Sequence, residues 1–90
     1  MLTVTDSAKQ HLKELLLARS NDPEFGVRLA RKAPGQTELV LDREAPGDQV
    51  IEHEGLKVLL VEPELARLLE KATLDVRDTP DGPKLELYLT

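Results

Sequence analysis

Cysteine is absent from the 90 residues of this chain. Without thiols, the chain has no disulfide, no thiolate nucleophile and none of the cysteine ligands that hold zinc or iron–sulfur clusters. Aromatic residues are nearly absent too, because Phe25 and Tyr88 are the only two. Stacking platforms for nucleic acid, aromatic cages for cations and aromatic belts at membrane interfaces are therefore excluded.

Long hydrophobic runs are also missing. The apolar run Val58–Val61 is far shorter than the roughly 20 residues that cross a bilayer, and the N-terminus lacks the basic and apolar regions of a secretory signal. Acidic residues outnumber basic ones by 17 to 12, and the net charge of -5 opposes binding to nucleic acid and to anionic lipid. We therefore expect a cytoplasmic protein with no nucleic-acid partner and no membrane partner.

What the chain does contain is a balanced mixture of residues. Hydrophobic residues make up 40% of it and charged residues 32%, which is typical of a folded domain and not of a disordered tail. A chain of this length is expected to form one domain with one core.

Hydrophobic spacing predicts one longer helix near the N-terminus and a short helix further along. Ser7 and Gln10 stand at the spacing of a capping box, so the first helix is expected to begin at Ser7. Pro63 favours the start of the second helix. The apolar residues at helical spacing are Ala8, Leu12, Leu15 and Leu16 in the first helix and Leu65, Leu68 and Leu69 in the second.

Alternation of apolar and polar residues predicts strands, separated by turns that contain proline or glycine. The order is one helix, four strands, a short helix and two strands, which predicts an α+β domain with a mainly antiparallel sheet. The strands are expected around Phe25–Ala30, Leu39–Leu41, Val50–Ile51, Leu56–Val61, Leu74–Arg77 and Leu85–Leu89. The expected core is Leu12, Leu15, Leu16, Val27, Leu29, Leu39, Leu41, Val58, Leu60, Leu65, Leu68, Leu69, Leu74, Val76, Leu85 and Leu87.

Blocks of sequence along the whole chain resemble the A-type iron–sulfur carriers, the HesB/IscA-like family. The resemblance implies a single HesB-like domain over residues 1–90, with the family's first helix, first core strand, central hairpin, short second helix and following strand in the same order. The matching blocks are Leu2–Ala8, Phe25–Leu29, Gly47–Ile51, Glu54–Val61, Pro63–Leu69 and Ala72–Val76.

The chain departs from this family at the cluster ligands. The family holds its cluster with a cysteine in a Gly-Cys-Ser-Gly loop after the first strand and with a Cys-Gly-Cys pair beyond the last strand. The corresponding first loop here is Arg31–Thr37, which has no cysteine, and no Cys-Gly-Cys motif is present. We therefore expect no bound cluster, no other cofactor and no catalytic residue, and the resemblance supplies no metal ligand.

Uneven charge is the strongest remaining indication of a binding site. Arg28, Arg31 and Lys32 occur in a stretch without acidic residues, whereas the stretch from Glu44 to Glu54 has acidic residues and no basic ones. Exposed backbone N–H groups of the Pro-Gly loop would help to hold an anion. The alternative is an ordinary solvated hairpin. The candidate contacts for an anion or a partner are Arg28, Arg31, Lys32, Gly35 and Gln36.

Other polar residues suggest weaker alternatives. His53 stands between Glu52 and Glu54 and suggests a metal site, but neighbouring side chains in a strand point to opposite faces. Asp75 alternates with apolar residues, as expected for the solvent face of a strand, and Ser20 has a loop-like context.

Three function hypotheses remain open on these observations. The first is a non-enzymatic HesB-like scaffold or protein-interaction module linked to iron–sulfur biogenesis. The second is a domain that binds a small anion or metabolite, and the third handles a metal near His53. A small core and an apolar C-terminal strand with an open edge also favour an equilibrium between monomer and homodimer.

Overall fold

The computed structural model describes residues 2–33 and 36–89. These residues form an α+β domain with one longer helix and one short helix, as expected. The elements in order are β1 (Thr3–Val4), α1 (Asp6–Arg19), β2 (Phe25–Ala33), β3 (Gln36–Arg43), β4 (Gln49–His53), β5 (Leu56–Val61), α2 (Pro63–Leu68), β6 (Ala72–Thr79) and β7 (Gly82–Leu89).

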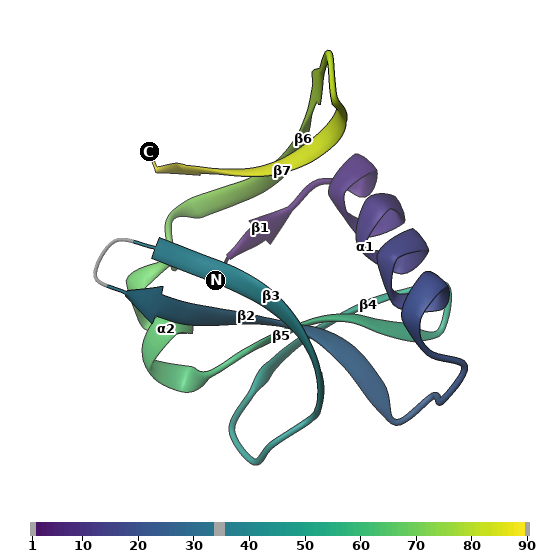
Figure 1. Cartoon of the computed structure of the whole chain (residues 1–90). Helices are drawn as coiled ribbons and strands as arrows, with labels where there is room; N and C mark the ends of the chain where they lie inside the picture. Colours follow the sequence, from purple (N-terminus) through teal and green to yellow (C-terminus); the bar gives the residue numbers. More distant parts are fainter. Residues whose placement is uncertain (1, 34–35, 90) are drawn as a thin grey trace.

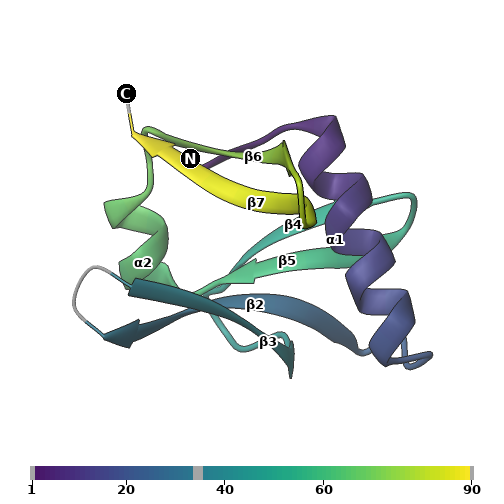
Figure 2. The same cartoon turned by 45° about the horizontal axis from the view of Figure 1, so that its top comes forward.

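The strands are divided between two sheets. One sheet has the order β1-β6-β7 and the other has the order β3-β2-β5-β4. Most neighbours are antiparallel, as predicted, but β1 pairs with β6 and β2 pairs with β5 in parallel. Figures 1 and 2 show one sheet above the other, with α1 along one side and α2 at the opposite end.

The core lies between the two sheets and α1. Strand β5 contributes most, because Val58, Leu59, Leu60 and Val61 are all completely buried. Strand β5 is an interior strand, and a register shift against β4 leaves Val58 without a partner there. This register shift is a β-bulge, and consecutive residues Val58 and Leu59 both belong to the core cluster there. Leu60 is buried outside that cluster.

Of the 16 predicted core residues, eight are buried, Leu15 is half-buried outside the core cluster, and the prediction of Leu68 is wrong. Leu68 is 64% exposed, because the short helix α2 buries only Leu65. Several predicted residues are partly buried against the central cluster and do not lie inside it: Leu39, Leu41, Leu69, Val76, Leu85 and Leu87. The prediction missed the buried residues Leu2, Ala8, Ile51, Leu59, Val61 and Ala72.

Helix α1 begins earlier than the predicted capping box. The hydroxyl of Thr5 accepts a hydrogen bond from the N–H of Ala8 at 3.2 Å, so Thr5 is the N-cap and Ser7 lies exposed inside the helix. The N–H of Thr5 also donates to the carbonyl of Leu74 at 3.0 Å. Pairing of β1 with β6 keeps the chain extended up to Thr5, and this fixes where the helix starts.

Candidate functional site

Arg28, the first of the predicted contact residues, lies in a network of carboxylates. Its guanidinium donates to both carboxylate oxygens of Asp48, at 3.1 and 2.7 Å, and to Asp42 Oδ2 at 2.8 Å. It also donates to the carbonyl of Arg43 at 2.9 Å. The Asp48 side chain is only 1% exposed and accepts a further hydrogen bond from the N–H of Ala45 at 2.7 Å.

This network compensates the charge of Arg28. The hydrogen bond to Asp48 raises the pKa of Arg28, and the same bond lowers the pKa of Asp48. The pKa of Asp42 is also lowered, first by the backbone N–H of Arg43 and then by Arg28. Because Asp48 belongs to the connection between β3 and β4, the pair holds that connection against β2.

Arg31, Lys32 and Gln36 lie exposed at the β2–β3 hairpin. Gln36 pairs with Ala33 across the hairpin, while Gly35 lies outside the described residues. Within residues 2–33 and 36–89, neither Arg31 nor Lys32 forms an ion pair. Of the predicted basic contacts, Arg28 is therefore paired with carboxylates, whereas Arg31 and Lys32 are open to solvent. Their contact with an anion or a partner stays a prediction.

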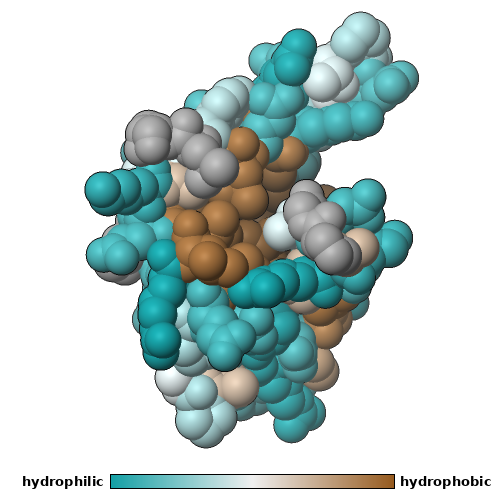
Figure 3. Space-filling view, turned by 90° about the vertical axis from the view of Figure 1, so that its left-hand side faces the viewer, coloured by the Kyte–Doolittle hydropathy of each residue, from teal (hydrophilic) through white to brown (hydrophobic). Residues whose placement is uncertain are grey.

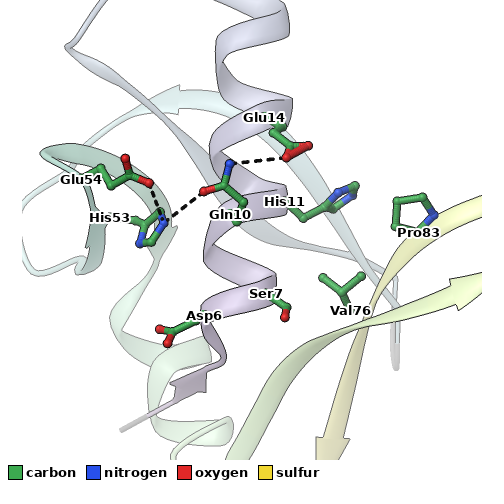
Figure 4. Close-up of a pocket in the computed structure, with 9 residues that line it drawn as sticks. All are labelled: Asp6, Ser7, Gln10, His11, Glu14, His53, Glu54, Val76 and Pro83. Atoms are coloured by element: carbon green, nitrogen blue, oxygen red, sulfur yellow. Dashed lines mark hydrogen bonds and ion pairs between the residues drawn. The ribbon is translucent and has the colours of Figure 1, made fainter.

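A second candidate is a broad polar cleft of about 730 Å³ between α1, the β4–β5 turn and the β6–β7 hairpin (Figure 4). The turn is tight, since Glu54 and Gly55 both have positive φ, at 52° and 81°. The lining residues are Asp6, Ser7, Gln10, His11, Glu14, His53, Glu54, Val76 and Pro83. The α1 acids Asp6 and Glu14 were not predicted as site residues from the sequence. Their spacing could have indicated them, because positions 6, 10 and 14 are four residues apart and lie on one helix face.

Four of the polar lining residues, Gln10, Glu14, His53 and Glu54, are joined to one another. His53 Nε2 lies 3.3 Å from Gln10 Oε1 and 3.2 Å from Glu54 Oε1. Gln10 in turn donates to Glu14 at 3.4 Å. Lys13 Nζ lies 3.0 Å from Glu54 Oε2, and this hydrogen bond lowers the pKa of Glu54.

The cleft does not assemble a metal site or a nucleophile. Figure 4 shows His11 pointing towards Val76 and Pro83, on the side of α1 away from His53. In the described part of the chain, no group of three or more His, Cys, Asp or Glu side chains is placed to hold a metal ion. No hydrogen bond joins the Ser7 hydroxyl to either histidine among these same residues.

The two other polar residues considered from sequence have structural contacts. Asp75 Oδ1 accepts hydrogen bonds from the Thr5 hydroxyl and from the N–H of Val76, both at 2.7 Å. The bond from Thr5 is the main cause of a lowered Asp75 pKa. The hydroxyl of Ser20 accepts from the N–H of Asp22 at 3.0 Å, just beyond the end of α1.

This chain, with two stacked sheets, one longer helix at their side and one short helix at their end, has the A-type HesB/IscA-like fold. Comparison with solved structures gives the same result over nearly the whole chain. The crystal structure of Escherichia coli SufA, a protein involved in biosynthesis of iron–sulfur clusters, matches with a TM-score of 0.70 and 26% identity, covering 98% of this chain and 84% of SufA.

Two further structures support the fold. IscA with its [2Fe-2S] cluster matches with a TM-score of 0.66 and 19% identity, covering 99% of this chain and 85% of IscA. A protein from Aquifex aeolicus, solved by NMR, matches with a TM-score of 0.64 and 19% identity, covering 99% of this chain and 91% of that protein. No family model matches the chain, and no curated protein matches it. None of the described helices is long and apolar enough to span a membrane.

The donor set of this chain does not fit an iron–sulfur cluster. Clusters are held by thiolates, and the chain has no cysteine. The resemblance places the family's first ligand loop at Arg31–Thr37, where the described side chains offer cations and neutral groups in place of a thiolate.

Proposed function

We propose that this protein is a non-enzymatic HesB/IscA-like interaction module that works with proteins of iron–sulfur biogenesis and does not itself carry a cluster. The single observation that carries the proposal is the combination of the SufA-like fold with the absence of every cysteine. The fold links the chain to SufA and IscA, and the missing thiolates remove the ligands that a cluster needs. A cytoplasmic location and the identity of the partner stay predictions.

Anaerobic reconstitution with iron and sulfide tests the part of the proposal that concerns the cluster. After gel filtration, the protein is expected to show no visible absorption from bound iron and sulfide. IscA, whose structure contains a [2Fe-2S] cluster, is the positive control under the same conditions. Stoichiometric absorption that stays with the protein peak contradicts the proposal and requires ligands other than cysteine.

A pull-down from native lysate tests the interaction. The bait is the wild-type chain, and a bait with Arg31→Glu and Lys32→Glu serves as the matched variant, because both side chains are exposed and their replacement leaves the core intact. Recovery of iron–sulfur biogenesis proteins with the wild-type bait supports the proposal. Recovery of none of them removes the proposed link.

A second candidate function, binding of a small anion, is favoured by one observation. Arg31 and Lys32 are exposed and have no ion pair among the described residues, so their charges are available to a ligand. Calorimetric titration with inorganic phosphate and with citrate tests it, with Arg31→Gln plus Lys32→Gln as the variant. Saturable binding that the variant loses supports this candidate, and heat that the variant retains contradicts it.

A further inference from the structure

Strand β3 forms one side of the four-stranded sheet and leaves a backbone edge open. It pairs with β2 only, so alternate N–H and C=O groups along its other edge have no strand partner. Gln36–Arg43 includes neither proline nor glycine, so no residue of β3 lacks an N–H donor. Strand β7 is outermost in the other sheet, but Pro83 near its start has no N–H to donate. Strand β3 is therefore the better edge for pairing with a further strand.

An apolar groove of about 360 Å³ lies between β3 and β7, and we call it the β3–β7 groove. Its lining is largely leucine and includes Leu29, Leu39, Leu74, Leu85 and Leu87. Leu39, Leu85 and Leu87 are only partly buried, so part of their apolar surface stays open to solvent. Figures 1 and 2 show β7 above β3, and Figure 3, viewed from the left-hand side of Figure 1, shows hydrophobic surface sunk between hydrophilic rims.

The exposed charge beside the open edge of β3 is negative. Glu38 is exposed, and among the described residues it takes part in no ion pair. Alternation along the strand puts Glu38 on the face of β3 opposite to Leu39 and Leu41. Lys84, the one Lys or Arg of the groove lining, belongs to β7 across the groove. A basic side chain is therefore favoured beside Glu38, and the net charge of -5 attracts a basic ligand to the chain as a whole.

These features together select the chemistry of an occupant. The open edge pairs with backbone donors and acceptors in alternation, which an extended peptide supplies and an acyl chain or a small anion does not. The leucine groove favours apolar side chains at every second position, because these lie on one face of a strand. The free carboxylate of Glu38 favours lysine or arginine on the opposite face.

We propose that β3 and the β3–β7 groove bind an extended basic segment of another protein, which adds to β3 as a further strand. The apolar side chains of this segment cover Leu39 and Leu87, and a basic side chain on its other face pairs with Glu38. The proposal rests on the function proposed above, since it states how such an interaction module holds its partner.

Fluorescence anisotropy of a labelled synthetic peptide, measured with the whole chain, tests the proposal. The heptapeptide Val-Lys-Val-Thr-Val-Lys-Val carries apolar residues at every second position and its lysines on the other face. It is expected to bind saturably. Threonine in place of the valines is expected to weaken binding by about tenfold or more, because apolar contact with the groove is lost. Glutamate in place of both lysines is expected to weaken it by about fivefold or more.

Two N-methylated versions of this peptide test whether it pairs as a strand. One carries a methyl group on the backbone nitrogen of every valine, and the other carries it on the remaining residues. N–H groups of alternate residues in a strand point to opposite edges, so only one of these two sets faces β3. One version is expected to lose binding by about tenfold or more, and the other is expected to keep it within about threefold. Equal binding of the two versions overturns the proposal.

A charge reversal at Glu38 tests the position of the peptide. Glu38→Lys is expected to weaken binding of the lysine peptide by about fivefold or more and to strengthen binding of the glutamate peptide. Glu24→Lys is the matched control, because it changes the net charge equally at an exposed position outside the groove lining, and its affinity is expected to stay within about twofold of wild type. Circular dichroism confirms that both variants are folded, since neither position is buried. Unchanged binding in Glu38→Lys overturns the proposal.

The remaining outcomes separate this surface from the proposed function. Failure of the peptide to bind, while the wild-type bait recovers iron–sulfur biogenesis proteins, overturns the proposal and leaves the proposed function standing. Peptide binding that depends on Glu38, while the bait recovers none of those proteins, supports the docking surface and removes the link to iron–sulfur biogenesis. Binding of dodecanoate in place of the peptide assigns the groove to an acyl chain, and self-association that excludes the peptide assigns it to a second copy. Either of these last results overturns the proposal.

Discussion

Replacement of Asp48 by alanine is expected to destabilise the protein more than any change at an exposed ion pair. The Asp48 side chain is 1% exposed, and the Arg28 side chain beside it is 13% exposed. The variant loses both oxygens that accept from Arg28 and the oxygen that accepts from the N–H of Ala45. It therefore leaves the Arg28 guanidinium with fewer partners in a partly buried environment, and it leaves the exposed N–H of Ala45 to water.

The expected loss of stability in Asp48→Ala depends on the hydrogen bonds that Arg28 keeps in the variant. Removing one partner of a buried ion pair typically costs about 3–5 kcal/mol. Arg28 keeps its hydrogen bonds to Asp42 and to the carbonyl of Arg43, so the loss lies below that range, at about 2–3 kcal/mol. For a domain of this length such a loss lowers the melting temperature by roughly 10–20 °C. Asp48→Asn keeps the size and one acceptor, so it is expected to cost less, about 1–2 kcal/mol.

The contribution of Asp48 also depends on pH. Its pKa is lowered from the ordinary value of 3.8, mainly by the hydrogen bond from Arg28. A carboxyl whose folded pKa lies below its unfolded pKa stabilises the fold fully above the unfolded value, and this stabilisation is lost as the pH falls through the folded value. Wild type is therefore expected to have a higher free energy of unfolding than Asp48→Ala at pH 7, and this difference is expected to shrink below about pH 4.

Urea unfolding followed by circular dichroism measures these differences at pH 7 and at low pH. Arg77→Gln is the control, because its ion pair with Glu86 is open to solvent, and its unfolding midpoint is expected to match wild type. The reasoning is refuted if Asp48→Ala lies within about 0.5 kcal/mol of wild type at pH 7. It is also refuted if the loss has the same size at both pH values.

Three further predictions concern the fold, each measured by the free energy of unfolding. Leu16→Ala is expected to cost about 2–5 kcal/mol and Leu68→Ala less than about 0.5 kcal/mol, because Leu16 is 3% exposed and Leu68 is 64% exposed; equal losses would contradict the assigned core. Gly26→Ala is expected to cost about 1–3 kcal/mol or more, because its Cβ would lie 2.6 Å from the backbone oxygen of Lys57. Unchanged stability would show that β2 and β5 move apart at this point without cost. Thr5→Ala is expected to cost about 1 kcal/mol and Ser7→Ala almost nothing, whereas the opposite order would restore Ser7 as the N-cap.

Local patterns in the sequence predicted much of the fold. Leu12 and Leu16 are one helical turn apart and both face the core, and alternation along β2 puts Val27 and Leu29 on its buried side. These predictions succeed because the period of the side chains is a property of the segment itself. The resemblance to HesB/IscA-like proteins also came from the sequence, and the solved structures support the same fold.

The absence of cysteine is likewise a property of the sequence alone. It removes the thiolate ligands whatever the fold, so the mismatch with an iron–sulfur cluster needed no coordinates. The surroundings of the basic residues, in contrast, could not be predicted from the sequence. Arg28 looked equivalent to Arg31 along the chain, but only the tertiary structure brings Asp48, 20 positions away, to the guanidinium of Arg28.

Tertiary structure alone decided the features that depend on which strands are neighbours. Thr5 and not Ser7 caps α1 because β1 pairs with β6, some 70 residues later, and Thr5 donates to Asp75 across that distance. Leu39 of β3 and Leu87 of β7 line the same groove only because the fold brings these strands of different sheets together. An apolar alternation tells which face of a strand is buried but not which strand lies beside it, since strand order is set by packing between distant segments.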